Sequence, residues 1–481
     1  MPNNLKQKTA SAIAWNFIDK FGQQAITFVI GIILARNFLT PSDYGLMGMI
    51  AVFNVLAMVL LDSGFSNALI RQSTVSPKEY STVFLLNIGI SIAAYLTLFF
   101  CAPAIAAFYR QPILVSVCRL NGLALILNAL AFVQIVVFTR ATDFKSITTA
   151  NLSGLLISGT AAVIMAYKGF GVYTLVLQNL IFIAIRNLRL WMVSSWKPSF
   201  VFDPKVIRGL WGYSSKLMIT GILNAVFNYI CPILIGRYYP PREVGFYSQA
   251  GKFSDLSSGT ISSSLQTATY PVMSQINDDN RRLKRSYRKI IRVTSFVSFP
   301  VMFGLAAVAV PLIHVLLKDQ WHTAAVYLQI LATGGAFTAL IALNMNVLYV
   351  KGLSSLSLIF EIIRKLLILS AVLLTFRYGI TCLIWGVTSV SVIGFFISCV
   401  FSEKQIDYRI HEQLKDISPY FVIAAIMAVG IYLLKYVIQN EAVLLLTQIT
   451  AGIVFYAGTT YILGSAIFKE MIELVKSRHF G

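Results

Sequence analysis

The chain has 481 residues, of which 57% are hydrophobic and only 12% are charged. An ordinary soluble domain carries about 45–50% apolar and about 25% charged residues, so this composition excludes a soluble enzyme and is typical of a chain dissolved in a bilayer. The formal net charge is +20. The basic residues are dispersed in short loops between apolar runs and form no aromatic-interleaved stripe, so we expect no nucleic-acid partner.

Apolar runs of near-spanning length recur along the chain and predict a polytopic helical membrane protein. A hydrocarbon core about 30 Å thick requires about 20 apolar residues in a helix. We therefore expect about 14 spanning helices, at residues 11–36, 43–69, 80–107, 112–138, 149–167, 171–195, 211–236, 244–274, 291–317, 323–350, 354–376, 379–402, 417–438 and 442–467. The eighth is rich in Ser and Thr from Ser257 to Thr269, and we include it because an internal repeat requires it. No signal peptide is expected before the first span, because Met1 to Thr9 is polar and lacks a cleavage site.

The loops between the predicted spans indicate the orientation. Assigning alternate loops to opposite sides places more Lys and Arg on the side that holds both termini, so the positive-inside rule predicts cytoplasmic termini. The densest basic run, Arg281 to Lys289, is predicted to lie in the loop after the eighth span. We favour a role for this basic run as a topology anchor over a role as a specific anionic-lipid site. The five cysteines are scattered, so we predict neither a disulfide framework nor a metal site.

A repeated motif divides the chain. Pro41-Ser42-Asp43-Tyr44-Gly45 after the first span recurs as Pro241-Arg242-Glu243-Val244-Gly245 after the seventh. We expect a tight external turn in which Pro fixes φ, the acid caps the next helix and Gly relieves crowding. Six spans per repeat is an even number, so both halves share one orientation. The predicted fold is an all-α polytopic membrane protein with two six-helix lobes in parallel repeat, at residues 1–196 and 197–402, followed by two helices and a cytoplasmic tail at 403–481.

Polar side chains inside the predicted spans are the candidates for function, because they are costly in lipid and usually face a cavity or a partner. Polar stripes occur on the first two helices of each repeat, and we expect them to line a water-filled cleft between the halves. The candidates are Asn16, Asp19, Lys20, Gln23, Asn54 and Asp62 in the first half, and Lys216, Asn224, Asn228, Gln249, Lys252 and Asp255 in the second.

The eleventh span carries a charged cluster. Glu361, Arg364 and Lys365 have the i, i+3, i+4 spacing of a salt bridge on one helix face. Two interpretations stay open here: a self-neutralising cluster that snorkels to the cytoplasmic interface, or a net positive wall of an inner cavity. In the second case Arg could grip phosphate oxygens and Lys could act as a point charge, which suits a lipid pyrophosphate. An exporter of cationic drugs would instead require a carboxylate, for which Asp19, Asp62 and Asp255 are available.

Catalytic patterns are missing from the sequence. The four histidines, His314, His322, His411 and His479, show no metal-ligand spacing, and no Gly-x-x-x-x-Gly-Lys loop is present to bind nucleotide. No long external loop could house a hydrolytic or glycosyl-transfer site. We therefore expect a transporter that is not an enzyme, with no metal and no direct use of ATP.

Several motifs resemble a known family. Ile33-Leu34-Ala35-Arg36 leading to Asp43-Tyr44-Gly45, followed by Asp62-Ser63-Gly64-Phe65-Ser66-Asn67, resembles the start of Wzx-type lipopolysaccharide and exopolysaccharide flippases. Tyr270-Pro271-Val272-Met273-Ser274-Gln275 resembles the colanic and teichuronic acid exporter-like subgroup. The resemblance covers nearly the whole chain to about residue 402. It implies a fold like that of the multidrug and toxin extruders (MATE), which belong to the same multidrug/oligosaccharidyl-lipid/polysaccharide exporter superfamily.

The resemblance also implies a task. Such a protein turns an undecaprenyl-pyrophosphate-linked oligosaccharide across the bacterial cytoplasmic (inner) membrane for polysaccharide biosynthesis, by alternating access through a cationic central cavity. We assign the anionic headgroup to the basic candidates Lys20, Lys216, Lys252, Arg364 and Lys365 on the polarity argument above. For ion coupling, or for tuning the basic groups, the candidates are Asp19, Asp62, Asp255 and Glu361. The other expected partners are membrane lipids and a polysaccharide polymerase or export machinery. We expect no cofactor, and coupling to H+ or Na+ stays open. The alternative is a MATE-like cation-coupled exporter of drugs or small metabolites.

Overall fold

The computed structural model describes residues 3–62, 65–72, 74–465 and 467–470. Within these residues the regular secondary structure is helical and contains no strand. The helices form two compact units that divide after Gly245. Ser63 and Gly64 of the family-like motif, His479 and the predicted tail from residue 471 lie outside the described residues.

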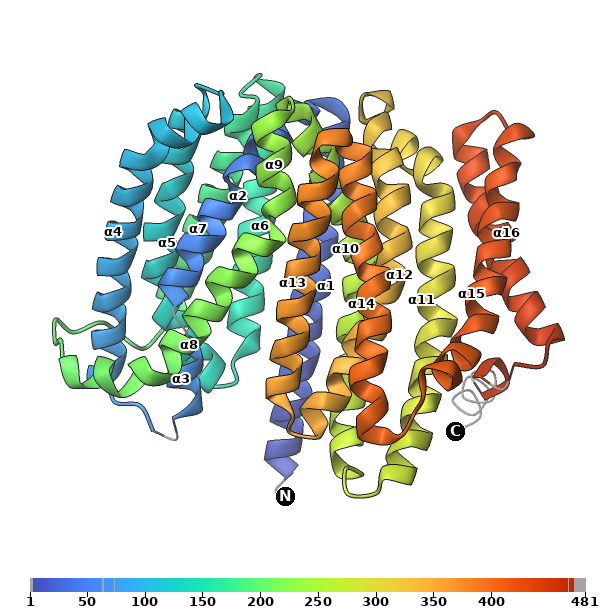
Figure 1. Ribbon diagram of the computed structural model, residues 1–481. Coiled ribbons are helices and arrows are strands. Elements are labelled where there is room, and N and C mark those ends of the chain that lie inside the picture. The colour runs from blue at the N-terminus through green and yellow to red at the C-terminus, as the bar shows by residue number, and fades with distance from the viewer. Residues whose placement is uncertain (1–2, 63–64, 73, 466, 471–481) are drawn as a thin grey trace. The chain divides into compact units, whose positions relative to one another are not determined.

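The first unit contains the helices up to residue 245 (Figure 1). They are α1 (Asn3–Asn37), α2 (Pro41–Asp62), α3 (Phe65–Arg71), α4 (Pro77–Tyr109), α5 (Leu114–Arg140), α6 (Phe144–Tyr167), α7 (Val172–Val193), α8 (Pro204–Asn228), α9 (Ile230–Tyr238) and the first turn of α10 (Pro241–Gln275). The second unit contains the rest of α10, then α11 (Asn280–Leu317), α12 (His322–Val350), α13 (Ser354–Thr375), α14 (Ile380–Ile406), α15 (Ile410–Leu433) and α16 (Glu441–Ile462). The lobe boundaries at residues 196 and 402 stay predictions, because units of close packing need not coincide with units of sequence repeat.

The predicted spans correspond to long helices. Eleven of the described helices are long and apolar enough to cross a membrane, or twelve if α8 and α9, which meet at a 42° bend, form one span. The two other predicted spans, 244–274 and 354–376, are the long helices α10 and α13. Helix α10 is more polar, and α13 is apolar but carries the charged residues Glu361, Arg364 and Lys365. The all-α polytopic membrane fold is therefore confirmed.

Helix α10 shows how a hydroxyl-rich segment stays helical. Ser258, Ser262 and Thr269 each donate their hydroxyl to the carbonyl four residues earlier, at 2.7–3.0 Å. Back-bonding of this kind satisfies polar side chains inside the helix itself. The segment from Ser257 to Thr269 is thus compatible with a continuous helix although its hydropathy is low.

The Pro-x-acid-x-Gly motifs are the first turns of α2 and α10. The prediction that they form tight turns between helices was wrong. Proline is favoured at the first helical position, where its missing N–H costs nothing, so Pro41 starts a helix as readily as a turn. The predicted capping role of the acid is confirmed for the first motif, because Asp43 Oδ2 accepts from the backbone N–H and the hydroxyl of Thr40, both at 2.8 Å.

The basic run from Arg281 to Lys289 lies on α11. Its placement in a loop was wrong, because hydropathy marks only the part of a helix that is in lipid. Asp279 caps this helix by accepting from the backbone N–H groups of Arg281 and Arg282, both at 3.0 Å. Helix α15 likewise begins at Ile410, ahead of the predicted start at residue 417. Both helices therefore continue beyond their apolar segments.

The linker between α7 and α8 is tied to the start of α4 within the first unit. The amide of Ser199 donates to Ser81 Oγ at 3.1 Å, and the amide of Asp203 donates to Thr82 Oγ1 at 3.2 Å. Lys78 Nζ lies 2.9 Å from Asp203 Oδ2. This bond from Lys78, together with the backbone N–H of Lys205, lowers the pKa of the half-buried Asp203 carboxyl below its ordinary value.

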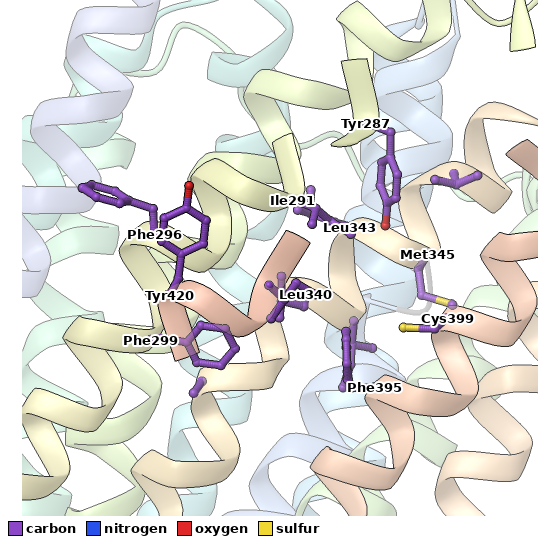
Figure 2. Packing of buried hydrophobic residues seen from close by; sticks show 14 of the residues in the cluster. Tyr287, Ile291, Phe296, Phe299, Leu340, Leu343, Met345, Phe395, Cys399 and Tyr420 are labelled. Atoms are coloured by element: carbon purple, nitrogen blue, oxygen red, sulfur yellow. The ribbon is translucent and has the colours of Figure 1, made fainter. Parts of the chain in front are cut away.

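Helix α11 is central to the core of the second unit. Figure 2 shows Ile291, Phe296 and Phe299 of α11 among residues from α12, α14 and α15. Tyr456 of α16 donates its hydroxyl to the Phe296 carbonyl at 3.0 Å, and the two rings are 5.4 Å apart. The two C-terminal helices are thus part of this core.

Candidate functional site

On α1 the predicted polar stripe separates into a paired acid and a solvated base. Asn151 Nδ2 of α6 donates to both carboxylate oxygens of Asp19, at 3.0 and 3.3 Å. Lys20 is exposed, and no carboxylate among the described residues forms an ion pair with it. Asn16 and Gln23 are half-buried. The adjacent acid therefore does not neutralise Lys20.

Helices α2 and α8 of the first unit carry the next candidates. Asn54 is half-buried in α2, whereas Asp62 is exposed at the last residue of that helix. On α8, Lys216, Asn224 and Asn228 are all exposed. Thr220 fills the intervening position and donates its hydroxyl to the Lys216 carbonyl at 2.9 Å. Residues spaced by four lie near one another on a helix surface, so α8 presents a continuous polar stripe.

On α10 the predicted acid and base also remain separate. Lys252 is half-buried and Asp255 is exposed. Their i, i+3 spacing allows a salt bridge, yet none joins these two side chains in the described part of the chain. Gln249, one turn earlier, is buried. Among the described residues, Lys20 in the first unit and Lys252 in the second are therefore both unpaired with the acid that neighbours them in sequence.

On α13 the predicted salt bridge forms. Arg364 Nη2 donates to Glu361 Oε2 at 2.9 Å, and each side chain is 34% exposed. Lys365 is half-buried beside them. One acid and two bases leave the cluster with net positive charge. The Arg364 Nε is buried and has no hydrogen-bond partner among the described residues, so this guanidinium retains a donor for an acceptor outside the cluster.

Two arginines inside spanning helices were overlooked by the sequence reasoning. Arg186 Nη2 of α7 donates to Asn128 Oδ1 of α5 at 2.8 Å, and Arg119 of α5 lies 4.1 Å from the centre of the Phe99 ring. Neither forms an ion pair with a carboxylate among the residues that the structure describes. The signal was available, because both residues stand within predicted spans. Neither residue lies on a polar stripe of the first two helices of a repeat or in the charged cluster of the eleventh predicted span.

A known protein family matches the part of the chain that holds most of the polar candidate residues described above. Residues 33–326 match the family described as polysaccharide biosynthesis protein. The chain belongs to this polysaccharide biosynthesis protein family. The match begins in α1 and ends in α12. The resemblance that the sequence motifs predicted is therefore confirmed.

Two relatives are similar to this chain over long stretches. The chain is 27% identical over 321 residues to the succinoglycan biosynthesis transport protein ExoT of Rhizobium meliloti. The matched stretch covers 66% of this chain and 65% of ExoT. The chain is 23% identical over 432 residues to the teichuronic acid biosynthesis protein TuaB of Bacillus subtilis. This stretch covers 89% of this chain and 89% of TuaB. The chain thus spans slightly less than two thirds of the length of ExoT and most of TuaB.

A solved structure supports the fold. The lipid II flippase MurJ, in an inward closed conformation, superposes with a TM-score of 0.74 over 96% of this chain and 100% of its own, at 16% sequence identity. At that identity the likeness shows the fold alone. The chain therefore has the all-α polytopic architecture that its apolar runs predict.

Proposed function

We propose that this protein is a flippase that moves undecaprenyl-pyrophosphate-linked oligosaccharide repeat units across the bacterial cytoplasmic membrane for lipopolysaccharide or exopolysaccharide biosynthesis. The observation that carries the proposal is the family match over residues 33–326. The names of the relatives support it, because ExoT is a biosynthesis transport protein and TuaB acts in teichuronic acid biosynthesis. In this role the protein transports its cargo and catalyses no covalent step.

The physical task is to carry a large polar headgroup past hydrocarbon. Polar groups without partners are costly in lipid, so a wet cleft lowers the barrier while the polyprenyl tail stays in the bilayer. The proposed orientation has both termini in the cytoplasm, and the repeats at 1–196 and 197–402 would rock against each other to open the cleft alternately. The segment 403–481 would accompany the second repeat. A polysaccharide polymerase or export machinery would receive the product.

The basic candidates supply the proposed contacts to pyrophosphate. Lys20 and Lys252 are suited to this role because neither pairs with its neighbouring acid in the described part of the chain. Arg364 keeps a free Nε donor, and its cluster keeps a net positive charge with Lys365. Lys216 lies on the polar stripe of α8. Charge-assisted hydrogen bonds to phosphate are about twice as strong as neutral ones, so a few such groups suffice.

The double variant Arg364→Gln with Lys365→Gln is expected to lower flipping by about tenfold or more, because hydrogen bonds to charged groups contribute about 1.5–3 kcal/mol. The measurement is the fraction of lipid-linked oligosaccharide in the outer leaflet of cells that carry each variant at equal protein level. Arg377→Gln is the matched control, since it removes an exposed positive charge just after α13. Normal flipping by the double variant would overturn the assignment of this cluster.

The leaflet distribution in cells that lack the protein tests the function itself. We expect lipid-linked oligosaccharide to accumulate on the cytoplasmic side and a plasmid copy to relieve this. An unchanged distribution, in a strain with normal surface polysaccharide and no second flippase gene, would contradict the proposal.

One observation favours a second candidate function, a MATE-like cation-coupled exporter of drugs or small metabolites. Asp255 forms no ion pair with Lys252, so an exposed carboxylate on α10 is available to a cation such as H+ or Na+. This function predicts that cells without the protein become sensitive to small toxic cations. Loss of resistance with a normal leaflet distribution would favour the exporter over the flippase.

A further inference from the structure

The first unit contains a pocket that the proposed transport function does not use. It has a volume of about 620 Å³ and lies between α4, α5 and the start of α7. Its walls include Tyr95, Ser116, Arg119 and Tyr173. The turn that joins α4 to α5 stands at the end of this unit opposite to the start of α1 (Figure 1). The proposed orientation therefore places the pocket near the outer surface of the membrane.

Arg119 is the charged group of this pocket. It is the sixth residue of α5, so its backbone lies about 7–8 Å inside the helix end. The guanidinium is half-buried over the Phe99 ring, and its Nε donates to the Phe99 carbonyl at 3.4 Å. Among the described residues no carboxylate pairs with it. An unpaired cation inside a spanning helix is costly and usually marks a ligand or a partner.

Two hydroxyl groups lie on the same wall. Ser116 Oγ and the Tyr173 hydroxyl oxygen are 2.6 Å apart, and Ser116 Oγ lies 3.0 Å from the Ile113 carbonyl. Ser116 can donate to either oxygen. The Tyr173 hydroxyl can therefore turn its proton to a ligand without leaving Ser116 unpaired. The pocket thus offers a guanidinium and a neutral donor, which together suit phosphate oxygens.

The other surfaces of the pocket are apolar. The lining is completed by Pro112, Val115, Leu120 and Leu123. On α4, Phe100 is 73% exposed and Leu96 lies on the same exposed surface. Apolar side chains exposed on a spanning helix face lipid, so a molecule held at Arg119 can extend acyl chains along α4.

We propose that this pocket binds the phosphodiester headgroup of an anionic glycerophospholipid. A phosphodiester carries one negative charge, which the single guanidinium of Arg119 matches. The pyrophosphate of a polyprenyl carrier has at least two negative charges and would require more cations than this pocket provides. The acyl chains and glycerol would contact the apolar lining, and Tyr173 would donate to a phosphate oxygen.

Native mass spectrometry of the purified full chain, titrated with phosphatidylglycerol, tests the proposal. We expect one tightly bound lipid in the wild type, and binding weaker by about tenfold or more in Arg119→Gln, because a charge-assisted bond is lost. Lys168→Gln is the matched control, since Lys168 is exposed in the turn just before α7 and its removal changes the net charge equally. Equal binding by Arg119→Gln and the wild type would overturn the proposal.

A milder variant and two competitors complete the experiment. Tyr173→Phe removes only a hydroxyl and should weaken binding by a few fold, which keeps the test decisive if Arg119→Gln fails to fold. Inorganic phosphate at millimolar concentration should leave the lipid in place, and its displacement of the lipid would indicate a free-anion site. Displacement by undecaprenyl pyrophosphate at equal concentration would assign the pocket to the cargo. Either displacement contradicts the proposed occupant.

Discussion

Asp416→Ala is expected to lower the free energy of unfolding of the second unit by about 3 kcal/mol. Asp416 Oδ2 accepts from Arg288 Nε at 2.7 Å, and Oδ1 accepts from Arg292 Nη2 at 2.5 Å. The hydroxyl of Tyr408 donates to Oδ2 at 2.6 Å. Removing the carboxylate leaves two arginines without their shared acid, and the loss of one partner of a buried pair costs about 3–5 kcal/mol.

The expected loss lies at the low end of that range because of solvent access. The Asp416 side chain is only 3% exposed, but the side chains of Arg288 and Arg292 are 36% and 39% exposed. Water can therefore solvate both guanidinium groups after the substitution. The measurement is the unfolding of purified protein during a titration with sodium dodecyl sulfate, followed by tryptophan fluorescence.

Glu470→Gln is the matched control for this experiment. Glu470 pairs with Lys289 on the same basic segment of α11, at 2.5 Å, but both side chains are about half exposed. Exposed pairs contribute about 0–1 kcal/mol, so the control should unfold almost as the wild type does. Equal losses for the two variants would show that burial of Asp416 does not determine the strength of its pairs.

The basic segment of α11 also shows what hydropathy can and cannot predict. Hydropathy predicts the apolar part of each spanning helix, because the free energy of moving that segment from water into lipid depends on its composition alone. The segment from Arg281 to Lys289 is helical because Asp279 caps it and because Arg288 reaches Asp416, a partner 128 residues away. A window of neighbouring residues contains no information about such a partner.

In the candidate site, too, the sequence predicts contacts within one helix but not contacts between helices. The Arg364–Glu361 pair follows from helical spacing and was found. The partner of Asp19 is Asn151 of α6, 132 residues away, and Arg186 is held by Asn128 of α5. These pairings depend on which helices pack together. Sequence reasoning therefore identified Asp19 as a candidate without showing that α6 already occupies its carboxylate.

Gly45→Val is expected to abolish transport and to destabilise the first unit by about 3 kcal/mol or more, since overpacking commonly costs about 1–3 kcal/mol. A Cβ atom built on Gly45 would overlap the carbonyl oxygen of Pro241. A Cβ atom on Gly245 would in turn overlap the carbonyl oxygen of Pro41. The obstacle is backbone in both cases, so no side chain can move aside. The first turns of α2 and α10 would have to separate.

Gly251→Ala is the matched control, because Gly251 lies on α10 and a Cβ there would meet no atom of the described residues within 4 Å. Replacing a helical glycine in open space should be neutral, or should stabilise the protein by up to about 1 kcal/mol. Detergent stability and the leaflet distribution of lipid-linked oligosaccharide measure the two consequences. A Gly45→Val protein with wild-type stability and transport would show that the two turns do not meet this closely.

The reciprocity of this contact explains why the motif is repeated. Gly45 meets Pro241 and Gly245 meets Pro41, so equivalent residues of the two motifs contact each other in the same way. An isologous contact of this kind requires the same surface on both partners. Proline starts each helix and the acid stands in its first turn, and glycine at the fifth position lets the two backbones touch. Gly245→Val should therefore impair stability and transport as strongly as Gly45→Val, and a variant at only one of the two positions is sufficient to separate the turns.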